Sequence, residues 1–245
     1  MSTDIFEKPV QLKAAHVDMY RRLRLSSMFS MLQEAAIEHT ILLGCPREKT
    51  LDRGLLWVVS HHLARVHRLP VYDEQLTLRT WPGRTMHLFF PRYCSFVDSQ
   101  GESVIETSSL WVLMDAKERK IAFPEKYDIV IPGEETGSEI SLPKRFLIKN
   151  TDQSAGITIP PSLVDMNGHL NNARYIDIIQ DLLPFEWYQK EIREICVEYI
   201  SEVRLGQELL IRYGTDQNRI FIAGETDRTV FRMRMEYSHD EIFRI

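Results

Sequence analysis

The stretch "VDMNGHLNNARYIDIIQD", residues 164–181, begins with polar side chains of varied chemistry and continues as an amphipathic helix. A second stretch, "VDMYRRLRLSSMFSMLQE" at residues 17–34, aligns with it without gaps, and Val, Asp, Met, one Leu and one Gln coincide. The apolar positions of the two helices run in phase at three- and four-residue spacing, which is typical of a helix with one buried face. Short β-rich runs follow each helix. This repeated order predicts an internal duplication.

The strand-rich regions extend the repeat over the chain. Four apolar runs lie between residues 55 and 124, separated by the turn signals "WPGR", "DSQGE" and "DAKERK". Four more runs follow a helix predicted at 172–188. A helix followed by a meander of strands predicts an α+β domain in which the helix lies on an antiparallel sheet. We therefore expect an N-terminal domain at 1–132, a polar linker at 133–148 and a C-terminal domain at 149–245.

Composition limits the classes of function. The 245 residues are 44% hydrophobic and 27% charged, as in ordinary globular proteins. A net charge of -5 disfavours general nucleic-acid binding, because phosphates need a basic surface. Three distant cysteines without a CxxC pair indicate neither a disulfide framework nor a zinc site. Without an apolar leader or a bilayer-length apolar run, the sequence predicts a cytoplasmic protein. No cofactor is expected, since no glycine-rich nucleotide loop or nucleophile elbow is present.

The polar cluster before the second helix has two interpretations. Asn171 or Asn172 could simply cap the helix. Alternatively, the free N–H groups and dipole of the helix N-terminus could stabilise a developing oxyanion in a reaction site. The first half has "YRR" where the second half has "NGH". A cap would be needed equally in both halves, whereas a reaction site need occur only once, so this difference favours one reaction site in each chain.

The run "DMNGHLNNARYIDI" resembles the D-x-N-x-H-x-N-N-x-x-Y signature of acyl-acyl-carrier-protein thioesterases, the tandem hot-dog enzymes of plants and bacteria. The segments "VEYISEVRLGQEL" and "FFPRYCSFVDSQGESVIETSSLWVLMD" also look like this family. The resemblance implies two tandem hot-dog domains, each with a long helix wrapped by an antiparallel sheet. It further implies hydrolysis of acyl-acyl-carrier protein to free fatty acid, which ends fatty acid synthesis, with acyl carrier protein as the partner. The alternatives are an acyl-CoA thioesterase of the same fold and a non-catalytic hot-dog protein that binds acyl thioesters.

The same resemblance implies roles for individual residues. Asn167 would orient the water or the thioester, and His169 would polarise the water or protonate the leaving thiolate. Asp165 matches the family's acid and would hold one of these two in place, although Asp18 at the matching position leaves a structural role open. Glu202 would act as general base or water holder. The next residue is Val203, where many plant members carry Cys, and this departure favours direct attack by water.

The pattern of the following strand bears on Glu202. Glu198 and Glu202 are four residues apart, so in a regular strand through 194–205 both point to one face. Pattern alone predicts that this face is solvated.

The remaining expectations concern substrate binding. The first half is expected to form the acyl-chain cavity with Met28 and Met31 of a helix predicted at 28–43, although ordinary core packing is the alternative. Asn171 and Asn172 complete the expected substrate-binding residues. Three arginines, Arg21, Arg22 and Arg24, are candidates for a basic patch that meets the carrier's phosphate. Whether two chains pair as a homodimer is left open.

Overall fold

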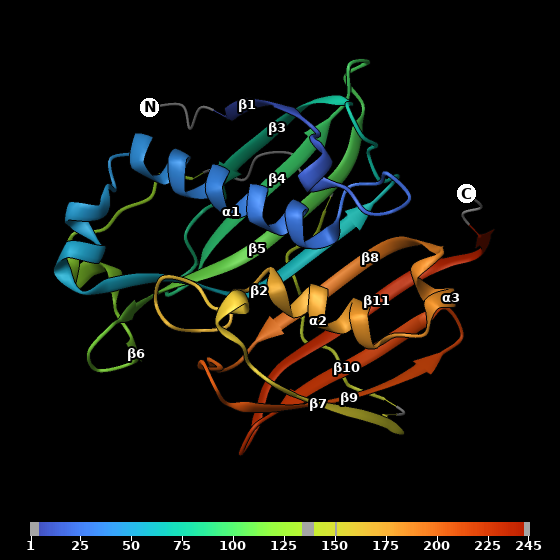
Figure 1. Cartoon of the computed structure of the whole chain (residues 1–245). Helices are drawn as coiled ribbons and strands as arrows, with labels where there is room; N and C mark the ends of the chain where they lie inside the picture. Colours follow the sequence, from blue (N-terminus) through green and yellow to red (C-terminus); the bar gives the residue numbers. More distant parts are fainter. Residues whose placement is uncertain (1–4, 134–139, 150, 243–245) are drawn as a thin grey trace. The chain divides into compact units, whose positions relative to one another are not determined.

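The computed structural model describes residues 5–133, 140–149 and 151–242. It is an α+β chain with a large antiparallel β-sheet and few helices, and it divides into two compact units (Figure 1). The first unit comprises the described parts of Met1–Gln11, Met31–Ala64 and Glu74–Pro143, and the second those of Leu12–Ser30, Arg65–Asp73 and Lys144–Ile245. The units therefore interleave along the chain. These units do not follow the predicted domain boundaries, so the domains at 1–132 and 149–245 stay a prediction.

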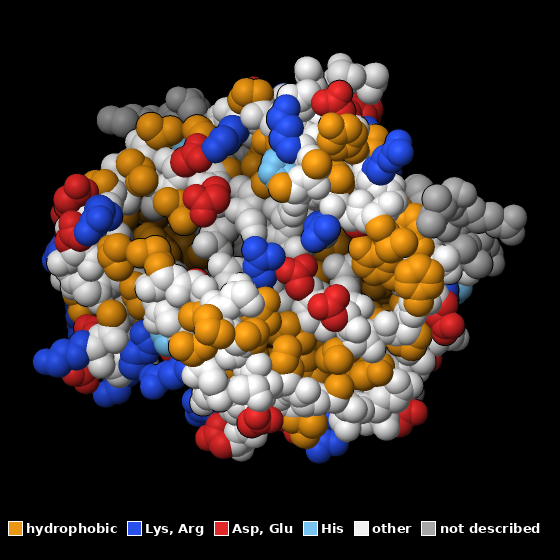
Figure 2. All heavy atoms as spheres, viewed as in Figure 1, with side chains coloured by type: hydrophobic (Ala, Val, Ile, Leu, Met, Phe, Trp, Pro, Cys, Tyr) orange, Lys and Arg blue, Asp and Glu red, His pale blue; other side chains and the backbone are white. Residues whose placement is uncertain are grey.

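Basic and acidic side chains lie interspersed among apolar ones on the face drawn in Figure 2. Among the described residues, no helix combines the length and the apolar character that crossing a bilayer requires. Within the same part of the chain, no three His, Cys, Asp or Glu side chains gather as metal ligands would. The predicted linker at 133–148 falls partly on residues 134–139, outside the described residues, and its described part has neither helix nor strand.

Helix α1 (Leu25–Leu42) contains neither Pro nor Gly and ends in a left-handed glycine. Gly44, at φ 82°, donates its N–H to the carbonyl of Ile41, and the next N–H, of Cys45, reaches the carbonyl of Thr40. These two bonds satisfy carbonyl groups that have no hydrogen-bond partner within the helix. The geometry requires a residue at position 44 that tolerates a positive φ. The glycine therefore fixes where the helix stops.

The sheet of the first unit has the strand order β1-β3-β4-β5-β2, and α1 lies over it (Figure 1). The buried residues of α1 include Leu32, Ala35, Ala36 and His39, at the spacing expected for one side of a helix. The strands are β1 (Phe6–Gln11), β2 (Leu55–Val66), β3 (Gln75–Pro82), β4 (Phe90–Val97) and β5 (Ser103–Asp115), with a short β6 (Lys120–Ile121) paired to β5.

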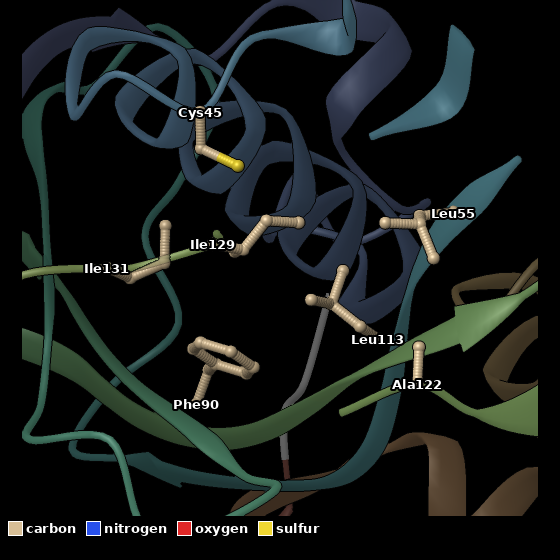
Figure 3. Packing of buried hydrophobic residues seen from close by; sticks show 7 residues of the cluster. All are labelled: Cys45, Leu55, Phe90, Leu113, Ala122, Ile129 and Ile131. Carbon is tan, nitrogen blue, oxygen red and sulfur yellow. The ribbon is translucent and has the colours of Figure 1, made fainter. Parts of the chain in front are cut away.

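A hydrophobic cluster closes the first unit at the end of α1 (Figure 3). Its buried members include Leu55 at the start of β2, Leu113 of β5 and Phe90 of β4. The other members are Cys45, Ala122, Ile129 and Ile131. Because they come from segments far apart in the sequence, this cluster ties the irregular segment after β6 to the sheet.

The second unit repeats the strand order of the first. Its sheet runs β7-β9-β10-β11-β8, so in both units the first strand pairs with the third and the second strand lies beside the fifth. Short 3₁₀ turns at Ala14–His16 and Pro161–Leu163 follow the first strand of each unit. The strands are β7 (Gln153–Thr158), β8 (Lys190–Tyr199), β9 (Glu208–Asp216), β10 (Arg219–Glu225) and β11 (Thr229–Ile242).

The prediction of one helix at 172–188 is wrong in its extent. Helix α2 (Arg174–Leu182) stops before Pro184, and a single turn, α3 (Phe185–Tyr188), follows. Proline has no N–H to donate and disfavours helical geometry in the residue before it. Leu183 accordingly has ψ 146°, in the extended region. The Tyr175 ring of α2 still packs edge-on against Phe231 of β11, with ring centroids 4.8 Å apart, so α2 rests on its sheet.

Candidate active site

Residues 164–170 form a tight hairpin-like loop just before α2. Val164 and Leu170 pair as an isolated bridge, and the N–H of Asp165 donates to the carbonyl of His169 at 2.8 Å. Between them Gly168 has φ 80°, a conformation that favours glycine. The loop therefore projects the side chains of Asn167 and His169 from a fixed backbone.

The Asp165 carboxylate holds this backbone in place. One oxygen accepts the N–H of Asn167 at 2.8 Å and the N–H of His169 at 3.3 Å. The other oxygen accepts the side-chain amide of Asn167 at 3.5 Å, a long contact. Asp165 thus contacts both predicted catalytic residues, mainly through their main chain. Its catalytic role stays a prediction.

His169 and Glu202 come together as a pair. His169 Nε2 lies 3.2 Å from a carboxylate oxygen of Glu202, and the two side chains are 18% and 29% exposed. The backbone brings them together, because Leu170 donates its N–H to the carbonyl of Val203 at 2.7 Å and His169 bridges to Arg204. A half-buried imidazole beside a carboxylate has the arrangement of a general base with its orienting partner.

The predicted strand through 194–205 is wrong at its end. Strand β8 stops at Tyr199, and the N–H groups of Ile200 and Ser201 both donate to the carbonyl of Val230, which turns the chain out of the sheet. Glu202 therefore lies in a loop and does not share a strand face with Glu198.

The expectation that Glu198 is solvated is also wrong. Its side chain is 6% exposed and lies 3.0 Å from the guanidinium of Arg232 on β11 and 3.6 Å from that of Arg145. Arg145 belongs to the predicted linker, which crosses this face of the second unit. Strand alternation carries no information about such a crossing segment, so pattern could not reveal it.

The entrance of α2 is held by two further bonds. The side-chain oxygen of Asn171 accepts the N–H of Ala173 at 2.9 Å, but the N-cap of α2 is Ala173 and no side chain caps it, so Asn171 is not the N-cap that the sequence allowed. The carbonyl of Asn172 accepts the hydroxyl of Tyr199 at 2.9 Å. Burial raises the pKa of Tyr199, so this hydroxyl stays protonated as a donor. Nothing in the sequence pattern signalled this polar contact of Tyr199.

The two methionines expected to line an acyl cavity lie on α1. Met28 is fully buried and Met31 is half-buried. Their role in substrate binding stays a prediction, because ordinary core packing accounts equally well for their burial.

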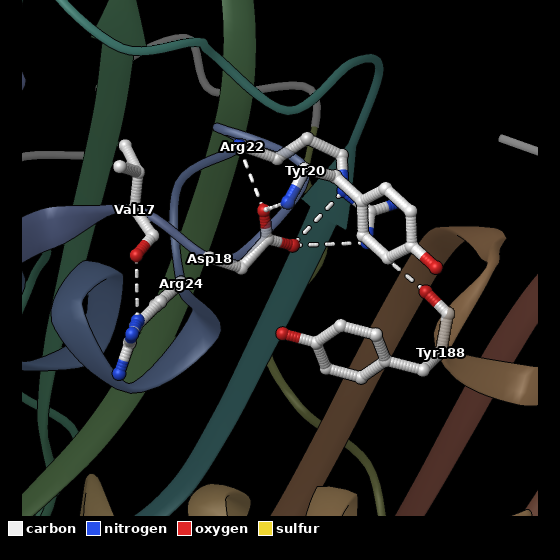
Figure 4. Close-up of polar contacts among 6 residues, drawn as sticks. All are labelled: Val17, Asp18, Tyr20, Arg22, Arg24 and Tyr188. Carbon is white, nitrogen blue, oxygen red and sulfur yellow. Dashed lines mark hydrogen bonds and ion pairs between the residues drawn. The ribbon is translucent and has the colours of Figure 1, made fainter. Parts of the chain in front are cut away.

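The first-half loop, residues 17–23, repeats the backbone pairing of loop 164–170, and Figure 4 shows its polar contacts. Val17 pairs with Leu23, and one oxygen of the Asp18 carboxylate accepts the N–H groups of Tyr20 and Arg22 at 2.8 and 2.9 Å. Arg21 takes the left-handed position, at φ 61°. An aspartate therefore organises the loop in both halves, which supports a structural role for the Asp165 carboxylate.

The side chains of the first-half loop differ from those of the second-half loop and make different contacts. Arg22 stands where the second half has His169, and its guanidinium pairs with Asp18 at 2.9 Å and donates to the carbonyl of Tyr188 at 3.0 Å. Leu23 donates its N–H to the carbonyl of Pro70, as Leu170 does to Val203. The residue before Pro70 is Leu69, in the place of Glu202. This loop thus lacks both members of the histidine–carboxylate pair.

Family models match both halves of the chain. The acyl-ACP thioesterase N-terminal domain matches residues 3–128, and the acyl-ACP thioesterase C-terminal domain matches residues 149–243. The chain belongs to the acyl-ACP thioesterase family. The family expected from the signature "DMNGHLNNARYIDI" is therefore confirmed.

Curated relatives of this chain include plant proteins. An acyl-acyl-carrier-protein hydrolase of Cuphea viscosissima, described as chloroplastic, is 26% identical over 81% of this chain and 52% of its own length. A chloroplastic dodecanoyl-acyl-carrier-protein hydrolase of Cinnamomum camphora is 26% identical over 84% of this chain and 58% of its own length. The chain thus spans little more than half the length of these relatives.

Solved structures match the acyl-ACP thioesterase fold over nearly the whole chain. An acyl-ACP thioesterase from Bacteroides thetaiotaomicron has 25% identity and a TM-score of 0.87, covering 96% of this chain and 98% of its own. The 12:0-ACP thioesterase from Umbellularia californica, at 20% identity, has a TM-score of 0.80, with 96% and 97% covered, and supports the fold alone. The predicted tandem hot-dog fold is confirmed.

Proposed function

We propose that this chain hydrolyses the thioester of acyl-acyl-carrier protein, releasing free fatty acid and the carrier's thiol. Family membership supports the reaction class, and the 3.2 Å contact between His169 and Glu202 is the observation that carries the site. Release of the acyl group would end its elongation in fatty acid synthesis. No cofactor is needed for this reaction.

The chemistry follows from the thioester. The oxygen of water attacks the carbonyl carbon and loses a proton to a base, and the carbonyl oxygen takes up negative charge. The tetrahedral intermediate then collapses as the carbon–sulfur bond breaks, and the proton passes to the leaving thiolate. A base that returns its proton to sulfur serves both steps.

The proposed roles follow from the contacts. His169 moves the proton, and the Glu202 carboxylate orients the imidazole and stabilises its protonated form. Asn167 projects from the same loop and orients the water or the thioester, while Asp165 fixes the loop that carries both residues. Among the described residues the N–H of Asn172 has no acceptor, so it is our candidate donor to the oxyanion at the entrance of α2.

The acyl group and the carrier are proposed to occupy separate surfaces. Met28 and Met31 would line the acyl-chain cavity, Asn171 and Asn172 would contact the thioester end, and acyl carrier protein would be the partner. A cytoplasmic location stays a prediction, and a pairing of two chains stays open.

The test is thiol release from a panel of acyl-acyl-carrier proteins and the matching acyl-CoAs, with wild type, His169→Ala and Lys120→Met in parallel. Lys120 is exposed on the short strand β6, so its substitution is the control. We expect turnover of the carrier-protein thioesters and a loss of about 100-fold to 10,000-fold in His169→Ala, the usual contribution of a general base.

Other outcomes separate the alternatives. Faster turnover of the CoA esters would favour an acyl-CoA thioesterase of the same fold. Binding of acyl-acyl-carrier protein without hydrolysis would favour a non-catalytic acyl-thioester-binding protein. Full activity in His169→Ala would show that the proposed site is not the catalytic site, and it would not affect the fold assignment.

A further inference from the structure

An exposed cation of the second unit lies on the same side of the chain as the histidine–carboxylate pair. Arg204 and His169 form an isolated antiparallel bridge, and residues that face each other in such a pair have their side chains on the same side. In the segment that leads to the bridge, alternation of side chains places Glu202 on that side as well. The 3.2 Å contact between His169 and Glu202 agrees with this placement. The Arg204 side chain therefore begins beside the pair.

The backbone of Arg204 is fixed by a short turn. Its N–H donates to the side-chain oxygen of Gln207 at 2.6 Å, and its carbonyl accepts the N–H of Gln207 at 3.1 Å. The next residue, Leu205, donates its N–H to the carbonyl of Gly168 at 3.4 Å, which joins this turn to loop 164–170. The point from which the Arg204 side chain extends is therefore held in place relative to His169.

The guanidinium of Arg204 does not stabilise the described part of the chain through polar contacts. It is exposed, and it forms neither a hydrogen bond nor an ion pair with any described residue. Other arginines of the same unit differ in this respect, since Arg232 pairs with Glu198 and Arg234 with Glu194. The N–H donors of the Arg204 guanidinium are therefore available to a molecule that approaches the pair.

The duplication supplies an independent argument. In the first half Val71 stands in the place of Arg204, and it bridges to Arg22, which stands in the place of His169. The loop that lacks the histidine–carboxylate pair thus has no cation at this position. Both halves need a residue here to form the bridge, but only the half with the pair has an arginine. Loop geometry therefore does not account for the guanidinium, whereas a contact with the substrate does.

We propose that Arg204 binds the pantetheine arm of the substrate's carrier through the amide carbonyls of the arm. The inference rests on the proposed thioesterase function. When the thioester carbon lies at His169 and Glu202, the arm extends from the sulfur, and its amide carbonyls are the first strong acceptors along it. A side chain that begins at the cross-strand neighbour of His169 can reach these oxygens, and a guanidinium donates N–H groups to them. The phosphate lies at the far end of the arm, beyond both amides.

The experiment measures kcat and KM of the full chain for one acyl group presented as three thioesters, on the carrier protein, on pantetheine and on ethanethiol. Pantetheine keeps the amides without the phosphate, and ethanethiol lacks both. Wild type is compared with Arg204→Gln, Arg204→Lys and the control Arg219→Gln. Arg219 is an exposed arginine of the same unit at the start of β10, where it pairs with Glu236.

In Arg204→Gln we expect KM to rise about tenfold for the carrier-protein and pantetheine esters with little change in kcat, because a contact with the arm is the same in the ground state and the transition state. The ethyl ester should show no such rise, because it has no arm. Arg204→Lys should recover part of the loss, since an ammonium still donates to the carbonyls. Arg219→Gln should match wild type with all three esters.

Other patterns would overturn the proposal. An equal loss with all three esters would mean that Arg204 acts on the loop or on the reacting atoms. A loss confined to the carrier-protein ester would mean that the guanidinium binds the phosphate or the carrier's own surface. Unchanged kinetics in Arg204→Gln would mean that it binds no part of the substrate. Failure of wild type to hydrolyse any of the esters would overturn the proposed function and this inference with it, and the wild-type rates distinguish that outcome from the others.

Discussion

Glu198 and Glu202 have the same side chain and lie four residues apart, yet they have different partners. Glu202 is partly exposed beside His169, whereas Glu198 is buried beside Arg232 and Arg145. We therefore expect Glu202 to act on the proposed reaction through His169, and Glu198 to act on stability.

Two matched substitutions test this division. In Glu202→Gln we expect kcat to fall about 100-fold or more with little change in unfolding temperature, because the imidazole loses its anionic partner. In Glu198→Gln we expect kcat to persist while stability falls by about 1–2 kcal/mol, a figure reduced because Arg232 is 38% exposed. Kinetics and urea unfolding on both variants check the prediction. A fall in kcat in Glu198→Gln together with a loss of stability in Glu202→Gln would mean that the two glutamates have the reverse roles.

His62 gives a prediction about acid stability. It is buried on β2, and burial lowers its pKa from 6.5 to about 3. The unfolded chain therefore binds this proton near pH 6.5, while the folded chain does not until near pH 3. Between these values the unfolded state binds more protons, so stability falls as the pH falls, by at most about 1.4 kcal/mol per pH unit.

The measurement is the unfolding free energy of wild type and His62→Gln at pH 7 and pH 5. We expect wild type to lose about 1–2 kcal/mol more than the variant over this interval, since glutamine does not titrate. Equal losses would show that His62 contributes nothing to the acid sensitivity.

At the residue level the structure brings one predicted pair together. Asp165, Asn167 and His169 came from the signature and Glu202 from the segment "VEYISEVRLGQEL", and the structure places His169 beside Glu202, while their catalytic roles stay a prediction. The partners of Glu198 could not be predicted, because Arg145 reaches it from a segment without regular structure. Contacts across such distances in sequence leave no periodic signal.

At the level of elements, the two loops before α1 and α2 have the same backbone pairing, but their aspartates bind different groups. Asp18 binds two main-chain N–H groups and a buried guanidinium, with side chains 6% and 5% exposed for Asp18 and Arg22. Asp165 binds main-chain N–H groups and one amide.

We expect Asp18→Asn to cost about 3 kcal/mol or more, since it leaves the Arg22 charge buried without its counter-ion. Asp165→Asn should cost only about 1 kcal/mol in stability, because an amide oxygen can still accept the main-chain bonds. Chemical unfolding of the two variants checks the difference. Similar losses would mean that the ion pair adds nothing to the loop.

Elements with strong periodicity were predicted and those without it were missed. The four strands expected in each half are present, but β1 and β7 were not predicted because they are short edge strands with few large apolar residues. The break at Pro184 was readable from the sequence, since proline seldom continues a helix. The prediction gave the apolar spacing of residues 172–188 more weight than that rule.

At the scale of the whole molecule, the second unit depends on segments from the first hundred residues. Leu23, Leu25 and Leu69 line the same cavity as Trp187 and Tyr237, and Arg22 bonds the carbonyl of Tyr188. A fragment cut in the predicted linker would leave these surfaces uncovered.

We therefore expect a fragment of residues 144–245 to lack a cooperative thermal transition under conditions where the full chain has one. Adding a second fragment of residues 1–143 should restore the transition, because it supplies the missing segments. Circular dichroism melts of each fragment and of the mixture check this. A cooperative melt of the 144–245 fragment alone would show that its own core suffices.

The bond between Arg22 of the first-half loop and the Tyr188 carbonyl also determines when this loop can complete its folding during synthesis. The loop at residues 17–23 leaves the ribosome early, but the Tyr188 carbonyl that receives Arg22 follows more than a hundred residues later. At about 5–20 residues per second, the 166 residues between the two partners take about 8–33 seconds to synthesise before this bond can form. Leu23 and Leu25, which are buried beside Trp187 and Tyr237 in the folded chain, lack these partners during that interval, so we expect chaperones to engage the nascent chain near its beginning.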